Sequence, residues 1–111
     1  MIPAEHYVIL SALLFITGGV GFLVRRNVLV TLMSIEVMLN ASNLALVAFN
    51  RSRLAHVATQ TYVGASHTGQ VFAFFIIAAE AAEVAVGLAI VLAFYRLRRT
   101  VRSDEADLLK N

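Results

Sequence analysis

Three long runs of apolar residues follow one another along the chain, separated by polar breaks. They cover residues 7–24, 28–49 and 71–95, and a helix of about 17 to 25 such residues can cross the hydrocarbon core of a bilayer. The segment 50–70 is polar and holds no fourth run, and the tail 96–111 is charged. The pattern predicts an all-α membrane protein, a single membrane domain with three transmembrane helices and an irregular loop before the third.

The overall composition agrees with this fold class and limits the chemistry that the chain can carry alone. Of its 111 residues, 59% are hydrophobic and 14% are charged, and the mean hydropathy of +0.79 is too high for an ordinary soluble domain. Each loop or tail is shorter than about 25 residues, and a marginal soluble domain needs about 40. The absence of cysteine excludes disulfides, thiolate metal sites and iron–sulfur clusters on this chain. We expect no nucleic-acid partner.

Lysine and arginine are distributed unevenly between the two sides of the predicted bundle. Seven of the nine lie in the break at 25–27 or in the tail, against two in the 50–70 segment and none before the first helix. Because cytoplasmic loops are enriched in positive charge, we expect the N-terminus outside, a polar outer loop at 50–70 and a cytoplasmic tail at 96–111. The short first break predicts a tight antiparallel hairpin of the first two helices.

Three carboxylates interrupt the apolar runs. Glu36 lies in the second run, and Glu80 and Glu83 lie in the third. A charged side chain at the centre of a membrane helix costs about 2.5 to 3.5 kcal/mol on insertion scales. Such residues are rare in membrane helices and mark functional sites by default. Glu36 and Glu83 both lie close to the middle of their runs, so we expect them at similar depths in the bilayer.

Glu36 shares one side of its helix with two asparagines. At about 100° per residue, Asn40 lies about 40° to one side of Glu36 and Asn43 about 20° to the other. We expect this polar stripe to face protein. Carboxylates at this depth can pass protons or hold a cation, or can form an ion pair that fixes an assembly. We favour proton transfer for Glu36 and Glu83, whereas for Glu80 transfer and pairing stay equally open.

Other polar residues carry weaker functional interpretations. Arg25 and Arg26 are best explained as topology signals at the end of the first helix, and the alternative is that their charge tunes the cytoplasmic end of a proton path. The three histidines show no convincing metal spacing, so we expect no metal site. They are His6, His56 and His67.

Several strings in the chain match a known family. They are MIPAEHYVILSALLFITGGVGFLVRRN at the start, SIEVMLNASNLALVAF in the second run, and GQV followed by AAEVAVGLAIVLAFYR in the third. The chain resembles the small three-helix K subunit in the membrane arm of respiratory complex I, the proton-pumping NADH-quinone oxidoreductase. The resemblance spans nearly the whole chain, and its most specific parts are the E-x-M-L-N-A-x-N-L string around Glu36 and the A-E-V-A-V-G-L string around Glu83.

The resemblance implies roles for particular residues. One acid in the second helix and one in the third belong to the family's central proton path, and these match Glu36 and Glu83. The basic pair after the first helix, Arg25 and Arg26 here, is also typical of the family. Glu80 departs from the pattern, because the family usually has a small apolar residue there, so no role is carried over to it.

The resemblance also implies how the chain works in an assembly. The subunit would bind no cofactor itself, while NADH, flavin, iron–sulfur clusters and quinone would be handled by partner subunits. Its neighbours in the membrane arm would be the antiporter-like and the quinone-proximal subunits. We expect it in an energy-conserving membrane, the bacterial plasma membrane, as a translocase subunit of the respiratory electron-transport chain that is not catalytic alone.

Two other assemblies use a related subunit, namely multi-subunit sodium/proton antiporters and membrane-bound hydrogenases. The residues of this chain do not decide among them. A small multidrug transporter is disfavoured, because it needs four helices and an acid in the first, and residues 7–24 contain no ionisable side chain beyond Tyr7. The two-helix rotor subunit of ATP synthase lacks a third span, and a purely structural scaffold stays open.

Overall fold

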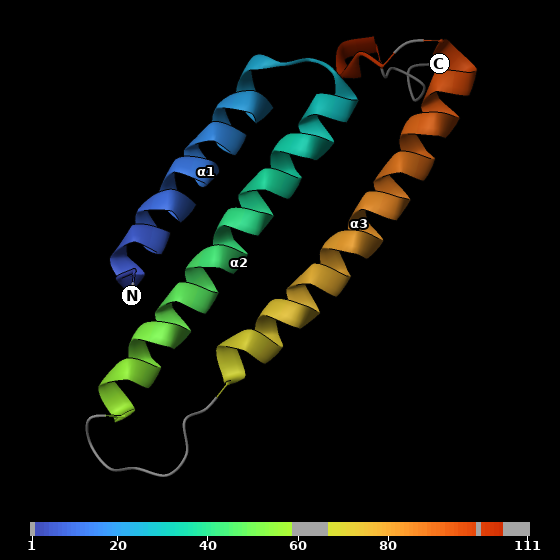
Figure 1. Cartoon of the computed structure of the whole chain (residues 1–111). Coiled ribbons are helices and arrows are strands. Elements are labelled where there is room, and N and C mark those ends of the chain that lie inside the picture. Colours follow the sequence, from blue (N-terminus) through green and yellow to red (C-terminus); the bar gives the residue numbers. More distant parts are fainter. Residues whose placement is uncertain (1, 59–66, 100, 106–111) are drawn as a thin grey trace.

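Three long helices form the molecule, a computed structural model that describes residues 2–58, 67–99 and 101–105. The helices are α1 (Ala4–Val24), α2 (Val28–Ala58) and α3 (Thr68–Arg98), and a single 3-10 turn, η1, follows at Ser103–Glu105. Helix α2 lies between α1 and α3 and packs against both (Figure 1). All three helices are long and apolar enough to cross a membrane, which confirms the predicted fold class.

The helices extend beyond the apolar runs that predicted them. Helix α1 begins at Ala4, and α3 extends to Arg98. The expectation of an irregular loop across 50–70 is wrong for 50–58, which continue α2, and for 68–70, which begin α3; residues 59–66 lie outside the described part of the chain. The extra turns of α2 contain arginine, leucine and alanine, which favour helix in water as well as in lipid.

Local sequence sets where each helix begins and ends. Pro3, whose ring fixes a backbone angle compatible with a helix start, precedes α1. The side-chain oxygen of Asn27 accepts a hydrogen bond from the backbone N–H of Leu29 at 2.9 Å, which caps the start of α2. Arg99 adopts a left-handed conformation with φ of 57° and donates its N–H to the carbonyl of Tyr95 at 2.7 Å, which ends α3.

Small residues occupy the inside of the bundle, and large apolar side chains cover its outside. The buried apolar residues among those described are Ala41, Ala48, Ala73 and Val91. Phenylalanine, leucine and isoleucine side chains are exposed along all three helices. This distribution suits a protein surrounded by lipid, in which helices associate through close backbone approach instead of through burial of large side chains.

Glycines on α1 allow it to approach α2 closely. A Cβ atom at Gly18 would lie 2.7 Å from Cγ of Met38 and 2.8 Å from the carbonyl oxygen of Ser34. The hydroxyl of Ser11 donates to the carbonyl oxygen of Ala41 at 2.6 Å across the same contact. The two helices therefore meet over much of the length of α1 through small residues and one interhelical hydrogen bond.

A matched pair of alanine substitutions tests this packing. Gly18→Ala should lower stability by about 1 to 3 kcal/mol, the usual cost of inserting a methyl group into a close contact. Gly19→Ala should be neutral or slightly stabilising, because no atom lies within 4 Å of the added Cβ and alanine favours a helix more than glycine does. The midpoint of thermal unfolding in detergent measures both, and equal effects of the two variants would contradict the close contact at Gly18.

Candidate functional site: a polar seam between α2 and α3

The interface between α2 and α3, called the seam below, has a register fixed by specific contacts. The side-chain amide nitrogen of Asn43 on α2 donates to the carbonyl oxygen of Ala73 on α3 at 3.4 Å. Further along, Gly87 leaves space that Leu32 fills, since a Cβ atom at Gly87 would lie 2.9 Å from Cδ2 of Leu32. Both contacts are antiparallel, but they differ in alignment by three residues: the first sets Glu36 level with Glu80, and the second sets it level with Glu83.

Counted from the Asn43–Ala73 contact, Glu36 and Glu80 lie at the same level of the seam. Glu36 precedes Asn43 by seven residues, and Glu80 follows Ala73 by seven residues. Seven residues are about two helical turns, so each acid returns to the face of its helix that carries the Asn43–Ala73 contact. Because the helices are antiparallel, both steps lead in the same direction along the bundle.

Glu80 is enclosed by the protein. It is 4% exposed, and its Oε1 atom has no hydrogen-bond partner among the described residues. Two other buried side-chain atoms on α2 are also without a partner, Oδ1 of Asn43 and Nδ2 of Asn50, and the backbone of Gly69 approaches Asn50 closely from α3. Buried polar atoms are normally hydrogen-bonded to protein or to ordered water. Three buried polar atoms of the seam, one each on Glu80, Asn43 and Asn50, could therefore each form a further hydrogen bond, for example to water.

The predicted polar stripe on α2 divides into two different environments. Asn43 is 7% exposed and contacts α3, whereas Asn40 is exposed on the surface of the chain. The amide of Asn40 donates to the carbonyl oxygen of Glu36 at 2.9 Å and lies 3.5 Å from its Oε1. The exposure of Glu36 is intermediate between that of the buried Asn43 and that of the exposed Asn40. Only part of the stripe therefore faces protein within this chain.

Glu83 lies outside the seam. Its residue is exposed, as are Val86 and Ile90 further along the same side of α3. Glu36 and Glu83 are expected at similar depths, whereas the acid of α3 that is buried against the rest of the chain is Glu80. The signal that could have identified Glu80 is its spacing, because Ala73, Glu80 and Gly87 repeat every seven residues and so share one helix face.

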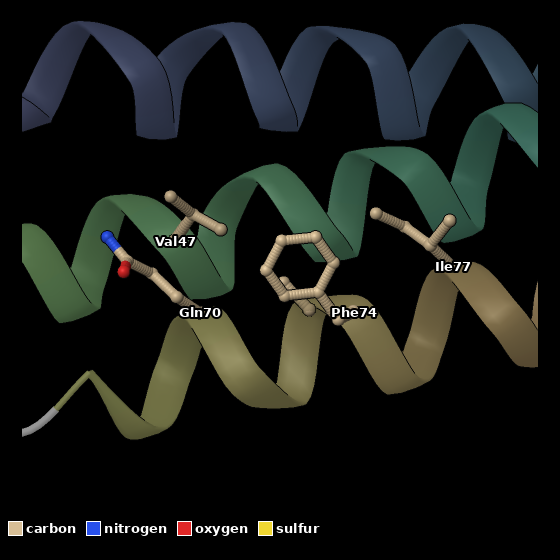
Figure 2. A pocket seen from close by; sticks show the side chains of 5 residues that line it. Val47, Gln70, Phe74 and Ile77 are labelled. Carbon is tan, nitrogen blue, oxygen red and sulfur yellow. The ribbon is translucent and has the colours of Figure 1, made fainter.

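A groove opens along the seam on the side of the α2–α3 connection. It has a volume of about 300 Å³ and is lined by Val47, Gln70, Ala73, Phe74 and Ile77. Figure 2 shows Gln70, Phe74 and Ile77 rising from α3 beside Val47 of α2. None of the three carboxylates lines this groove, and Gln70 is its one polar side chain. The groove therefore suits an apolar occupant and carries no chemistry of its own.

The segment after α3 closes on the turn between α1 and α2, a contact called the clasp below. Backbone hydrogen bonds join Val28 N–H to the carbonyl of Val101 at 2.8 Å and Ser103 N–H to the carbonyl of Arg26 at 2.9 Å. The guanidinium of Arg26 lies 3.5 Å from Asp104. Arg25 and Arg26 are both exposed. The basic pair lies in the turn between α1 and α2, at one end of the bundle, ten or more residues before Glu36.

Asp104 forms the ion pairs of the clasp, with Arg26 and with Arg102. Arg102 donates to both of its carboxylate oxygens, at 3.2 and 2.8 Å. These hydrogen bonds are the main reason that the pKa of Asp104 lies below its usual value, and the charges of Arg102 and Arg26 add to the effect. All three side chains are at least partly exposed to solvent, so each pair is individually weak.

Comparison with known proteins agrees with the resemblance. Residues 6–111 match the family described as NADH-ubiquinone/plastoquinone oxidoreductase chain 4L. The chain belongs to this family. A relative named NADH-quinone oxidoreductase subunit K, from Sorangium cellulosum strain So ce56, is 58% identical over 110 residues, covering 99% of this chain and 97% of the relative. Subunit K 1 from Koribacter versatilis strain Ellin345 is 52% identical over 109 residues, covering 98% and 96%.

Family membership directs attention to the acids and not to a cofactor site. Among the residues that the structure describes, no group of three or more histidine, cysteine, aspartate or glutamate side chains could hold a metal ion. The seam presents carboxylates, amides and unpartnered polar atoms instead. Carboxylates can accept, hold and release protons, directly or through water, and the amides can hydrogen-bond to them or to that water.

Replacing Asp104 by asparagine tests the clasp. Because the folded-state pKa of Asp104 is lowered, its contribution to the clasp is present above the unfolded-state pKa and is lost as the pH falls through the folded-state pKa. Asp104→Asn should therefore speed hydrogen exchange at the Val28 amide at neutral pH, and the two proteins should exchange alike once Asp104 is protonated.

Hydrogen exchange of the assembled protein in detergent, read at Val28 across a pH series, measures this difference. Glu5→Gln provides the control, because Glu5 is an exposed acid at the other end of α1. Equal exchange in wild type and Asp104→Asn at neutral pH would show that the backbone hydrogen bonds hold the clasp without the acid.

Proposed function

We propose that this chain is the K subunit in the membrane arm of a proton-translocating NADH-quinone oxidoreductase, where Glu36 and Glu83 carry protons through the bilayer. Each acid would alternate between its carboxylic acid and carboxylate forms as protons arrive and leave. Full-length relatives with that printed name, at 58% and 52% identity, support the assembly. They also favour it over the related antiporter and hydrogenase assemblies.

The observation that carries the proposal is the position of Glu36 in a polar seam between two membrane-spanning helices. Its carboxylate lies beside Asn40 and two turns from Asn43, and buried atoms of the seam still have hydrogen-bonding capacity. In hydrocarbon, an acid with no role would be costly to retain. Amide side chains at this depth would hold water by hydrogen bonds, and a proton can move from the acid through such water.

The exposure of Glu83 supports the proposal that another subunit covers this side of α3. Its side of α3 is exposed in the single chain, next to Val86 at 61% and Ile90 at 63% exposure. A carboxylate facing lipid tails would cost about 2.5 to 3.5 kcal/mol on insertion scales, so a neighbouring subunit should cover this face with a polar group opposite Glu83. We propose that Glu83 passes its proton to or from that neighbour, an antiporter-like or quinone-proximal subunit.

The proposal also covers the orientation of the chain in the membrane and the subunits that bind the cofactors. We propose that the N-terminus faces outward and the tail faces the cytoplasm across the bacterial plasma membrane, in keeping with the distribution of arginine and lysine. Arg25 and Arg26 would then lie at the cytoplasmic end, as topology signals that can also tune the proton path. NADH, flavin, iron–sulfur clusters and quinone would be bound by partner subunits.

Glutamine substitutions at Glu36 and Glu83 test the relay. In the assembled complex reconstituted in liposomes, Glu83→Gln and Glu36→Gln should each slow NADH-driven proton translocation by about tenfold or more, because glutamine keeps the shape of the side chain but cannot carry the proton. The initial rate of internal pH change is the measurement, with the amount of assembled complex as the reference.

Two comparisons separate proton transfer from packing. Glu5→Gln, at an exposed acid in the first turn of α1, should leave translocation unchanged. If Glu36→Ala impairs the complex while Glu36→Gln does not, Glu36 acts in packing, and unimpaired translocation in Glu83→Gln would refute the relay.

A further inference from the structure

Glu80 has no role in the family pattern, yet it is the most enclosed of the three membrane acids. It is 4% exposed, whereas Glu36 is half-buried and Glu83 is exposed. A partner subunit or a lipid headgroup could reach Glu80 only if α2 and α3 separated. An ion pair with another chain therefore does not explain why this acid is present. Its neighbours within the chain must explain it.

On the α2 side, the neighbour of Glu80 is Glu36. The Asn43–Ala73 hydrogen bond places Glu36 level with the buried Glu80 across the seam, and the Leu32–Gly87 contact places it level with Glu83, three residues further along α3. Two facing carboxylates repel each other when both are ionised, so the favourable arrangement holds one proton between them. The unpartnered Oε1 atom of Glu80 leaves a position free to accept that proton or a water that delivers it.

Along α3, the neighbour of Glu80 is Glu83. Residues three apart on a helix are surface neighbours, with Cβ atoms about 5 to 6 Å apart. Glu80 is thus the one acid of the three that has another acid on each side, one across the seam and one on its own helix.

We propose that Glu80 is a third proton carrier, which takes the proton from Glu36 across the seam and gives it to Glu83 on the outer face of α3. This inference rests on the proposed function of the other two acids. In the first step the carboxylic acid of Glu36 loses its proton to the carboxylate of Glu80. In the second step Glu80 loses that proton to the carboxylate of Glu83, directly or through one water. The reverse order carries protons in the opposite direction.

Substitution of Glu80 in the assembled complex tests the inference. Glu80→Gln keeps the size of the side chain and removes the exchangeable acid, so NADH-driven proton translocation in liposomes should fall by about tenfold or more. The infrared difference spectrum between oxidised and reduced complex gives a second readout. Glu80→Gln should remove a carboxylic-acid carbonyl band that Glu5→Gln, the exposed-acid control, leaves in place.

Two substitutions with shorter side chains, Glu80→Asp and Glu80→Asn, provide a second test if the Glu80→Gln complex fails to assemble. Asp and Asn have the same size, but only Asp carries a proton. Faster translocation with Glu80→Asp than with Glu80→Asn supports a carrier, and equal rates in the two variants overturn the inference.

The outcomes distinguish this inference from the proposed function. If Glu36→Gln and Glu83→Gln slow translocation while Glu80→Gln and its infrared spectrum match wild type, Glu80 is not a carrier and the two-acid relay stands. If all three glutamine variants translocate protons at the wild-type rate, the relay and the role of Glu80 both fall.

Discussion

Close backbone contact between helices is the constraint on which the rest of this structure depends. Lipid tails are as apolar as leucine, so burying large apolar side chains does little to hold membrane helices together. Glycines instead let the helices approach, Gly18 between α1 and α2 and Gly87 between α2 and α3. Such contacts tolerate almost no sliding, and they therefore decide which polar side chains meet. The position of Glu36 relative to Glu80 and Glu83 follows from the packing of uncharged neighbours.

The sequence was sufficient to predict the three helices but not how each one is turned about its axis. Runs of apolar residues predict membrane spans because length and composition are enough for that purpose. A helix that is apolar on nearly every side has no preferred face, so the sequence alone does not predict whether Glu80 or Glu83 faces α2. Only the contact with α2 separates them. The end of α2 was also misjudged, because its polar last turns continue the helix beyond the apolar run.

The two acids of α3 belong to different parts of the molecule. Glu80 is surrounded by its own chain, so its environment is complete before any assembly forms. Glu83 is exposed, so its environment depends on whatever covers that side of α3. A polar route that begins at Glu36 would therefore be built partly by this chain and partly by its neighbours. Such a division would let a small subunit contribute to a proton path without holding all of it.

The clasp has a mechanical consequence for α3. The segment after α3 is hydrogen-bonded to the turn between α1 and α2, so this end of α3 is tied to the hairpin and cannot swing away from it. At the other end, Gly69 packs closely against the side chain of Asn50, and the Asn43–Ala73 hydrogen bond joins α3 to α2. Helix α3 is therefore held to different partners at its two ends, to the hairpin turn at one end and to α2 at the other. The acids of α3 lie between these two attachments, where a sideways displacement of either end would be felt least.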